Sequence, residues 1–169
     1  MSTSFVCKTC GKTHEGLPTD RGWTLPDVVW AIPEAEREDQ ARFNGDLCQF
    51  GDRFFIRCIL KLQFKEQPGY YGWGVWVEVS EADFYRYIEV YDKDGSGEPM
   101  VPGSIANEMP AYPSTLGLPV MVRFQNSTSR PTVHLSSTSN HPLAAEQSAG
   151  MDDQRYHAIL VATGAVSEP

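Results

Sequence analysis

Residues 55–79, FIRCILKLQFKEQPGYYGWGVWVEV, decide the fold of this chain. The first half alternates between apolar and polar side chains, with Arg57 and Lys61 on the polar face. Such alternation with a period of two predicts a strand that buries one face. Pro68-Gly69 then signals a turn, and residues 72–79 form a second alternating run, so we predict a long antiparallel hairpin. Its core-facing side chains are expected to be Ile56, Cys58, Leu60, Leu62 and Phe64 on the first strand and Trp73, Val75, Val77 and Val79 on the second.

A helix is expected directly after the hairpin. Ser80 is a favourable N-cap, and Glu81 and Asp83 are acidic residues in the first turn, where the helix dipole favours them. An apolar stripe at helical spacing would pack against the sheet. It consists of Phe84, Tyr87, Ile88 and Tyr91.

Beyond this helix, strand and helix signals follow one another without a βαβ rhythm. The expected elements are a loop over 92–103, a short turn or helix over 104–108, strands over 120–125 and 132–135, a helix from Pro142 that ends at Gly150, and a last helix from about Asp152. This order predicts an α+β fold, a single domain in which helices pack on an antiparallel sheet.

The start of the chain carries weaker signals. Residues 1–45 are expected to form an irregular, zinc-knuckle-like segment of the same domain, apart from a short surface helix that Pro33 begins and that runs to about Gln40. Residues 46–163 would form the α+β core, and residues 164–169 a frayed tail.

Composition restricts the class of partner. The 169 residues include 14 Lys and Arg against 22 Asp and Glu, a net charge of −8 that disfavours binding to a nucleic-acid backbone. No stretch approaches the roughly 20 apolar residues of a membrane helix. The first residues also show no export signal, so we expect a cytoplasmic protein without a membrane partner. Oligomeric state is not predicted.

A zinc site is the main chemical candidate. Cys7 and Cys10, followed by a glycine, have the spacing of a zinc knuckle, in which two thiolates chelate one tetrahedral ion. His14 would be the third ligand and Cys48 the fourth, with Asp46 as a hydrogen-bond partner of His14. We expect a structural zinc ion.

Two other interpretations of the cysteine pair stay open. A redox pair would have to begin a helix, which Gly11 and the residues up to Gly16 disfavour. Alternatively, Cys7 and Cys10 are ordinary residues of a turn. Cys58, on the apolar face of its strand, is expected to be an inert core residue.

Two further groups of residues could bind a metal ion or support catalysis. Residues 92–98 begin like a calcium loop, but Gly103 stands where the bidentate Glu belongs, so an acidic surface turn is expected. His141 and Glu146, near a helix start, could act as a general acid–base pair. The alternative is that His141 caps the helix or bonds to backbone.

A ligand face is the last candidate. Trp73 and Trp76 point to opposite faces of their strand, so one of them leaves the core unless both faces are covered. Arg57 and Arg130 could stack on that tryptophan or pair with an acid. Together the four residues would line a face for a protein partner or a small ligand.

An ordered set of motifs resembles a known family. The motifs are Cys7-x-x-Cys10-Gly11, His14-Glu15-Gly16-Leu17-Pro18, Asp46-Leu47-Cys48, Phe54-Phe55-Ile56-Arg57, Trp73-Gly74-Val75-Trp76-Val77, Tyr112-Pro113-x-Thr115, Arg130-Pro131 and His141-Pro142-Leu143-Ala144-x-Glu146-Gln147. The set, over about residues 5 to 160, resembles the bacterial domain of unknown function 2199. One departure is Ser139-Asn140, where the family pattern has Thr-Asp. The resemblance implies a bacterial, cytosolic, single-domain protein and no particular activity.

Three function hypotheses follow. The leading one is a zinc-stabilised binding module for a protein or a small ligand, in which metal binding stabilises the N-terminal segment. The second is a metal-dependent hydrolase whose ion keeps an open position beside Glu15 or Asp46. The third is an immunity-type inhibitor whose negative charge attracts a basic toxin.

Overall fold

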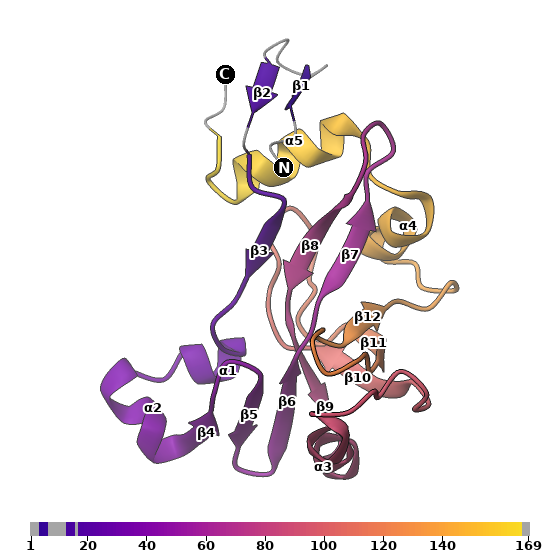
Figure 1. Ribbon diagram of the computed structural model, residues 1–169. Helices are drawn as coiled ribbons and strands as arrows, with labels where there is room; N and C mark the ends of the chain where they lie inside the picture. Colours follow the sequence, from indigo (N-terminus) through magenta and orange to yellow (C-terminus); the bar gives the residue numbers. More distant parts are fainter. Residues whose placement is uncertain (1–3, 7–12, 16, 167–169) are drawn as a thin grey trace.

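The protein has an α+β fold. The structure, a computed structural model, describes residues 4–6, 13–15 and 17–166 (Figure 1). Its largest sheet has seven strands, all antiparallel to their neighbours. In spatial order they are β12 (Thr132–His134), β11 (Pro119–Arg123), β10 (Val101–Ile105), β9 (Trp76–Val79), β6 (Arg53–Arg57), β5 (Leu47–Phe50) and β4 (Ala41–Phe43).

Two smaller sheets complete the strand arrangement. The three-stranded sheet has the order β3 (Asp20–Gly22), β8 (Tyr70–Gly74) and β7 (Leu60–Gln63), and β3 runs parallel to β8. The two-stranded sheet pairs β1 (Ser4–Val6) with β2 (Thr13–Glu15).

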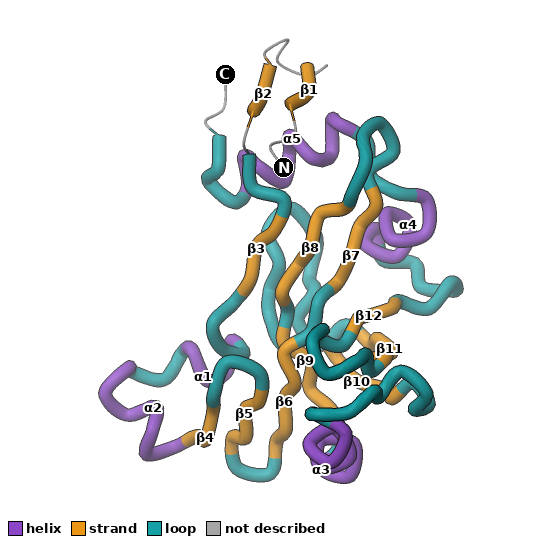
Figure 2. Tube along the Cα trace, viewed as in Figure 1, coloured by secondary structure: helices purple, strands orange, loops and turns teal. Residues whose placement is uncertain are grey.

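The predicted hairpin links the two larger sheets. Its first strand is β6 followed by β7, and its second is β8 followed by β9, as Figure 2 shows. Arg57 faces Trp76 and Leu60 faces Trp73, so one register runs through both sheets. Where the strands bend between the sheets, the Cys58 amide donates to the Val75 carbonyl at 2.8 Å. The hairpin prediction is therefore confirmed.

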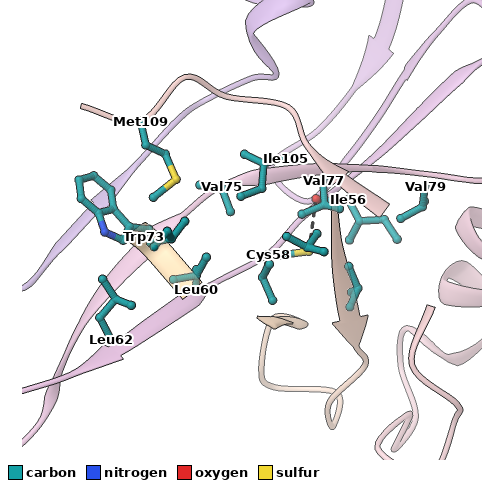
Figure 3. Close-up of a cluster of buried hydrophobic side chains, with 14 of the residues drawn as sticks. Ile56, Cys58, Leu60, Leu62, Trp73, Val75, Val77, Val79, Ile105 and Met109 are labelled. Carbon is teal, nitrogen blue, oxygen red and sulfur yellow. Dashed lines mark hydrogen bonds between the residues drawn. The ribbon is translucent and has the colours of Figure 1, made fainter. Parts of the chain in front are cut away.

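One face of the hairpin carries the main core. All the predicted core-facing residues lie in or against this cluster, and most of them are labelled in Figure 3 with Ile105 and Met109 from across the core. Leu143, Ile159 and Leu160 from the C-terminal helices complete it. The alternation of the sequence thus defines the main core correctly.

The opposite face has a smaller core at the β6/β9 end. We call it the small core; it consists of Leu25, Val29, Ala41, Cys48, Phe55, Trp76 and Ala106. Trp76 lies there and Trp73 lies in the main core, each with 0% of its surface exposed. Neither tryptophan leaves the core, because both faces of the sheet are covered here, which is the alternative that the sequence left open.

Five helices lie in the part of the chain described. They are α1 (Asp27–Trp30), α2 (Glu34–Gln40), α3 (Glu81–Val90), α4 (Pro142–Ala149) and α5 (Asp153–Ala162). The Ser80 side chain accepts from the Asp83 amide and the Asp152 side chain from the Arg155 amide, as capping predicts. None of these helices is long and apolar enough to cross a lipid bilayer.

Two local expectations are corrected. Phe84 and Tyr87 of α3 are buried, but Ile88 and Tyr91 are exposed, because the sheet covers only part of the apolar stripe. Residues 101–105 form a strand although Pro and Gly disfavour one there, since Gly103 allows close approach to β9.

The N-terminal segment is also more regular than expected. It contains α2, as predicted, but also α1 and the short strands β1 to β4. Strands of three residues pair through backbone groups and show no alternation, so no local pattern predicts them. The expected frayed tail includes residues 167–169, which lie outside the described part.

Candidate functional site

A polar cleft of about 650 Å³ opens on the hairpin, on the face that the small core covers at its other end. Its floor consists of Arg57, Ile59 and Lys61 from one strand and Tyr70, Gly72 and Gly74 from the other. Residues 20–22 of β3 border it on one side. Asp46, Tyr91 and residues 125–130 border it on the other.

Two glycines leave room for the Arg57 side chain. Gly22 of β3 and Gly74 of β8 are register partners in neighbouring parallel strands. A Cβ atom on Gly22 would lie 2.9 Å from Arg57 Nη2, and one on Gly74 would lie 3.1 Å from the Gly22 Cα. The guanidinium group therefore lies against bare backbone, in space that any other residue at position 22 would fill.

Among the described residues that line the cleft, Arg57 is the cation that buries a donor without a hydrogen-bond partner. Its Nε atom is buried and has no hydrogen-bond partner among the described residues, and Nη1 donates to the Gly45 carbonyl only at 3.5 Å. Burial and the charge of Arg130 lower the pKa of Arg57, while Asp46 partly offsets them. An arginine is still charged at neutral pH. The cleft thus holds a guanidinium group whose donors are available to an acceptor.

Asp46 links two side chains of the cleft wall opposite β3. Its Oδ2 accepts from the Tyr91 hydroxyl at 2.6 Å and its Oδ1 from Arg130 Nε at 3.2 Å. Although burial opposes ionisation, these two hydrogen bonds and the charges of Arg130 and Arg57 lower the pKa of Asp46. The carboxylate therefore fixes two side chains that follow α3 and precede β12.

The charge of the cleft is opposite to that of the whole chain. The side chains on the cleft face include three cations, Arg57, Lys61 and Arg130, and two carboxylates, Asp20 and Asp46, whereas Arg21 is the register partner of Trp73 and points to the opposite face. Three minus two leaves an excess of one positive charge, against −8 for the chain. A locally positive cleft in an acidic protein favours a small anion over a polyanion, which the rest of the surface repels.

The described lining offers binding groups and no activated nucleophile. Cys58 borders the cleft, but burial raises the pKa of its thiol, and the thiol contacts the Ile56 carbonyl at 3.5 Å. Within residues 17–166, no three His, Cys, Asp or Glu side chains are grouped to hold a metal ion. The residues that line the cleft include cations, hydroxyl groups and amides, which can bind a ligand.

Comparison with known proteins identifies the family. A family model of uncharacterized proteins conserved in bacteria, DUF2199, matches residues 6–151. The chain belongs to the DUF2199 family. The match confirms the resemblance of the sequence motifs and includes every cleft residue named above, but the family description assigns no activity. Comparisons with curated proteins and with solved structures gave no match.

The predicted zinc ligands of this DUF2199 chain are only partly described. Cys7 and Cys10 lie outside the described residues, and His14 belongs to β2. Cys48 is fully buried in the small core, and burial raises the pKa of its thiol to about 12. Figure 1 shows β2 and β5 at opposite ends of the molecule, so the structure does not bring Cys48 to His14.

Asp46 is likewise far from its expected partner. We predicted that it would bond to His14, whereas its two oxygens accept from Tyr91 and Arg130. These partners come from distant parts of the chain, and only the topology brings them together. Asp46 therefore accepts hydrogen bonds from two cleft residues that the sequence pattern does not connect with it.

His141 and Glu146, the predicted acid–base pair, form hydrogen bonds with groups in α4 and next to it. His141 Nδ1 accepts from the Leu143 amide at 3.1 Å, and Nε2 donates to the Pro113 carbonyl at 2.9 Å. Glu146 accepts from the Tyr112 hydroxyl at 2.7 Å and from Arg155. His141 is therefore the helix cap that the sequence offered as an alternative, and neither residue lines the cleft. Acid–base catalysis by this pair stays an untested prediction.

Two of the four residues predicted for a ligand face do line the cleft. Arg57 and Arg130 are among its cations, whereas Trp73 and Trp76 are buried on either side of the sheet. Sequence reasoning missed Lys61 and Tyr91. One signal was available for Lys61, because it lies on the same face of the strand as Arg57 and pairs with Gly72.

Proposed function

We propose that this DUF2199 chain binds a small anionic ligand in the cleft, with Arg57 as the principal contact. The observation that carries the proposal is the buried Nε of Arg57, which has no hydrogen-bond partner in the described structure. Leaving a buried donor unsatisfied costs about 1–3 kcal/mol, more when the group is charged. An oxyanion in the cleft would accept from the Nη2 end of the same guanidinium group, compensate its charge and offset the repulsion between Arg57 and Arg130.

The size and the openness of the site agree with this proposal. A volume of about 650 Å³ falls within the usual range for small-molecule sites. No feature of the described residues favours the metal-dependent hydrolase or the toxin inhibitor.

Calorimetric titration of the full chain with phosphate, sulfate and malonate tests the proposal. At least one of these anions should bind, and Arg57→Gln should weaken that binding at least tenfold. Arg42→Gln is the matched control, because it removes the same charge from an exposed residue outside the cleft. If no anion binds, or if both variants bind as the wild type does, the proposal is wrong.

We also propose that Cys7, Cys10 and His14 hold a zinc ion. The support is that the strands flanking residues 7–12 pair with each other, Val6 opposite Thr13, as expected for a knuckle between two strands. Cys48 is left out of this ligand set because β5 lies at the other end of the molecule (Figure 1).

Elemental analysis of chain purified without chelator or affinity tag tests the zinc proposal. About one zinc per chain is expected, and the double variant Cys7→Ser, Cys10→Ser should lose it. Cys48→Ser should keep its zinc. Wild-type chain free of metal would remove this proposal and leave the anion site unaffected.

A further inference from the structure

We infer that the natural ligand is a phosphomonoester on a hydroxylated small molecule. This inference rests on the proposed function and names the chemical class that fits the cleft. Three features carry it: the charge of the lining, the number of guanidinium donors, and the polar groups at the edge.

The charge of the lining suits a dianion. Asp46 is paired with Arg130, which leaves Arg57 and Lys61 as two cations on the cleft face without an ion-pair partner among the described residues. A phosphomonoester carries about −1.5 to −2 at pH 7, because its second pKa is near 6. A monocarboxylate would neutralise only one of these two cations, and a larger polyanion would meet the acidic remainder of the chain.

The donors exceed what one carboxylate can use. Among the described residues, Nη2 of Arg57 and both Nη atoms of Arg130 have no hydrogen-bond partner, while Arg130 Nε donates to Asp46. The two groups are close enough for Arg130 to lower the pKa of Arg57. A phosphate has three terminal oxygens and can bridge two guanidinium groups, whereas a carboxylate has two oxygens in one plane.

The rest of the cleft fits a ligand whose part beyond the phosphate is polar. Its volume is many times that of a phosphate group, so the ligand extends beyond the anion. Residues 126–129, Asn-Ser-Thr-Ser, border it with hydroxyl and amide groups, and Asp20 adds an acceptor for hydroxyl protons. Tyr70 adds an aromatic ring, over which the Lys61 ammonium lies 5.0 Å from the centroid. A sugar-like body would satisfy these groups better than an apolar one.

Titration of the full chain with a defined set of probes tests this inference. The probes are ribose 5-phosphate, glucose 6-phosphate, inorganic phosphate, ribose and malonate. At least one sugar phosphate should bind about tenfold more tightly than both inorganic phosphate and malonate, and ribose alone should not bind. Arg57→Gln should reduce the affinity for that sugar phosphate at least tenfold, while Arg42→Gln should not.

The outcomes separate this inference from the proposed function. If malonate binds as tightly as the sugar phosphates, the phosphate assignment is wrong and the anion site stands. If inorganic phosphate binds as tightly as both sugar phosphates, the inference that the ligand has a hydroxylated part besides its phosphate is wrong. If no probe binds in an Arg57-dependent way, both the inference and the proposed function fail.

Discussion

The two ends of one hairpin face differ in what covers them. At the β6/β9 end, Phe55 and Trp76 lie in the small core under α1 and the first residues of β4. Two residues further along the same face, Arg57 and Gly74 border the open cleft. Backbone pairing continues in one register through both ends. Side-chain size and charge therefore decide where the face is closed and where it stays open.

The closed end is held by polar contacts as well as by packing. Trp76 Nε1 donates to the Trp23 carbonyl at 2.9 Å, and the Trp76 amide donates to Asn107 Oδ1 at 2.8 Å. Asn107 is fully buried and donates in turn to the Leu25 carbonyl and to Asp27. Each of these polar groups has a hydrogen-bond partner, in contrast to the Nε of Arg57.

The largest expected effect comes from removing a large side chain from the small core, at the closed end. Trp76→Ala removes a fully buried indole and its hydrogen bond, so the free energy of unfolding should fall by about 3–5 kcal/mol. Urea unfolding followed by far-UV circular dichroism measures this loss. Trp30→Ala is the matched control, because Trp30 of α1 is 56% exposed and its removal should cost under about 1 kcal/mol. Equal losses in the two variants would contradict a structural role for the small core.

The local part of the fold was predictable from the sequence. The hairpin follows from alternation in residues 55–79, and the starts of α3, α4 and α5 follow from capping residues. The parallel pairing of β3 with β8 was not predictable, because Asp20–Gly22 has neither alternation nor bulky apolar residues. Such a strand is defined by its backbone partners, which lie about fifty residues away in the chain.

The site was predictable only in part, for the same reason. Arg57 was a candidate because it lies on the polar face of its strand and could stack on a tryptophan that leaves the core or pair with an acid. The contact of Asp46 with Tyr91 and Arg130 spans 45 and 84 residues of sequence, and no local pattern encodes it. The space beside Gly22 that Arg57 occupies likewise depends on the pairing of β3 with β8, which no local sequence pattern predicts.

The second prediction concerns the open end, where Gly22→Ala adds a single methyl group beside Arg57. Gly22→Ala places a Cβ about 2.9 Å from Arg57 Nη2, the mobile end of a long side chain, so Arg57 should move and the fold should persist. The affinity for the tightest-binding anion should fall about tenfold, near 1.4 kcal/mol, with under about 1 kcal/mol of lost stability. Titration and urea unfolding of the same sample measure both quantities. Gly97→Ala is the control, because nothing lies within 4 Å of its Cβ position. Unchanged affinity would show that the position of Arg57 does not matter for binding.

The third prediction removes the carboxylate that competes for Arg130. Asp46→Asn frees the charge of Arg130 Nε and takes one negative charge from the cleft wall, so the anion should bind about three- to tenfold more tightly. Titration measures the change, and Asp39→Asn in α2, which removes the same charge outside the cleft, should leave the affinity unchanged. A weaker affinity in Asp46→Asn would mean that Asp46 positions Arg130 for the ligand and does not compete with it.

The smallest expected effect is a pH dependence of the same carboxylate. Because the pKa of Asp46 is lowered in the folded chain, its ionised form stabilises the fold. That contribution is complete above the ordinary Asp value of about 3.9, and it is lost as the pH falls through the lowered value. The pair with Arg130 is partly exposed, so wild type should exceed Asp46→Asn by only about 0.2–1 kcal/mol at pH 7. Urea unfolding at a series of pH values should show this difference narrowing below about pH 4. A difference that stays constant down to acid pH would mean that packing of the side chain, and not its charge, fixes Tyr91 and Arg130 at the wall of the cleft.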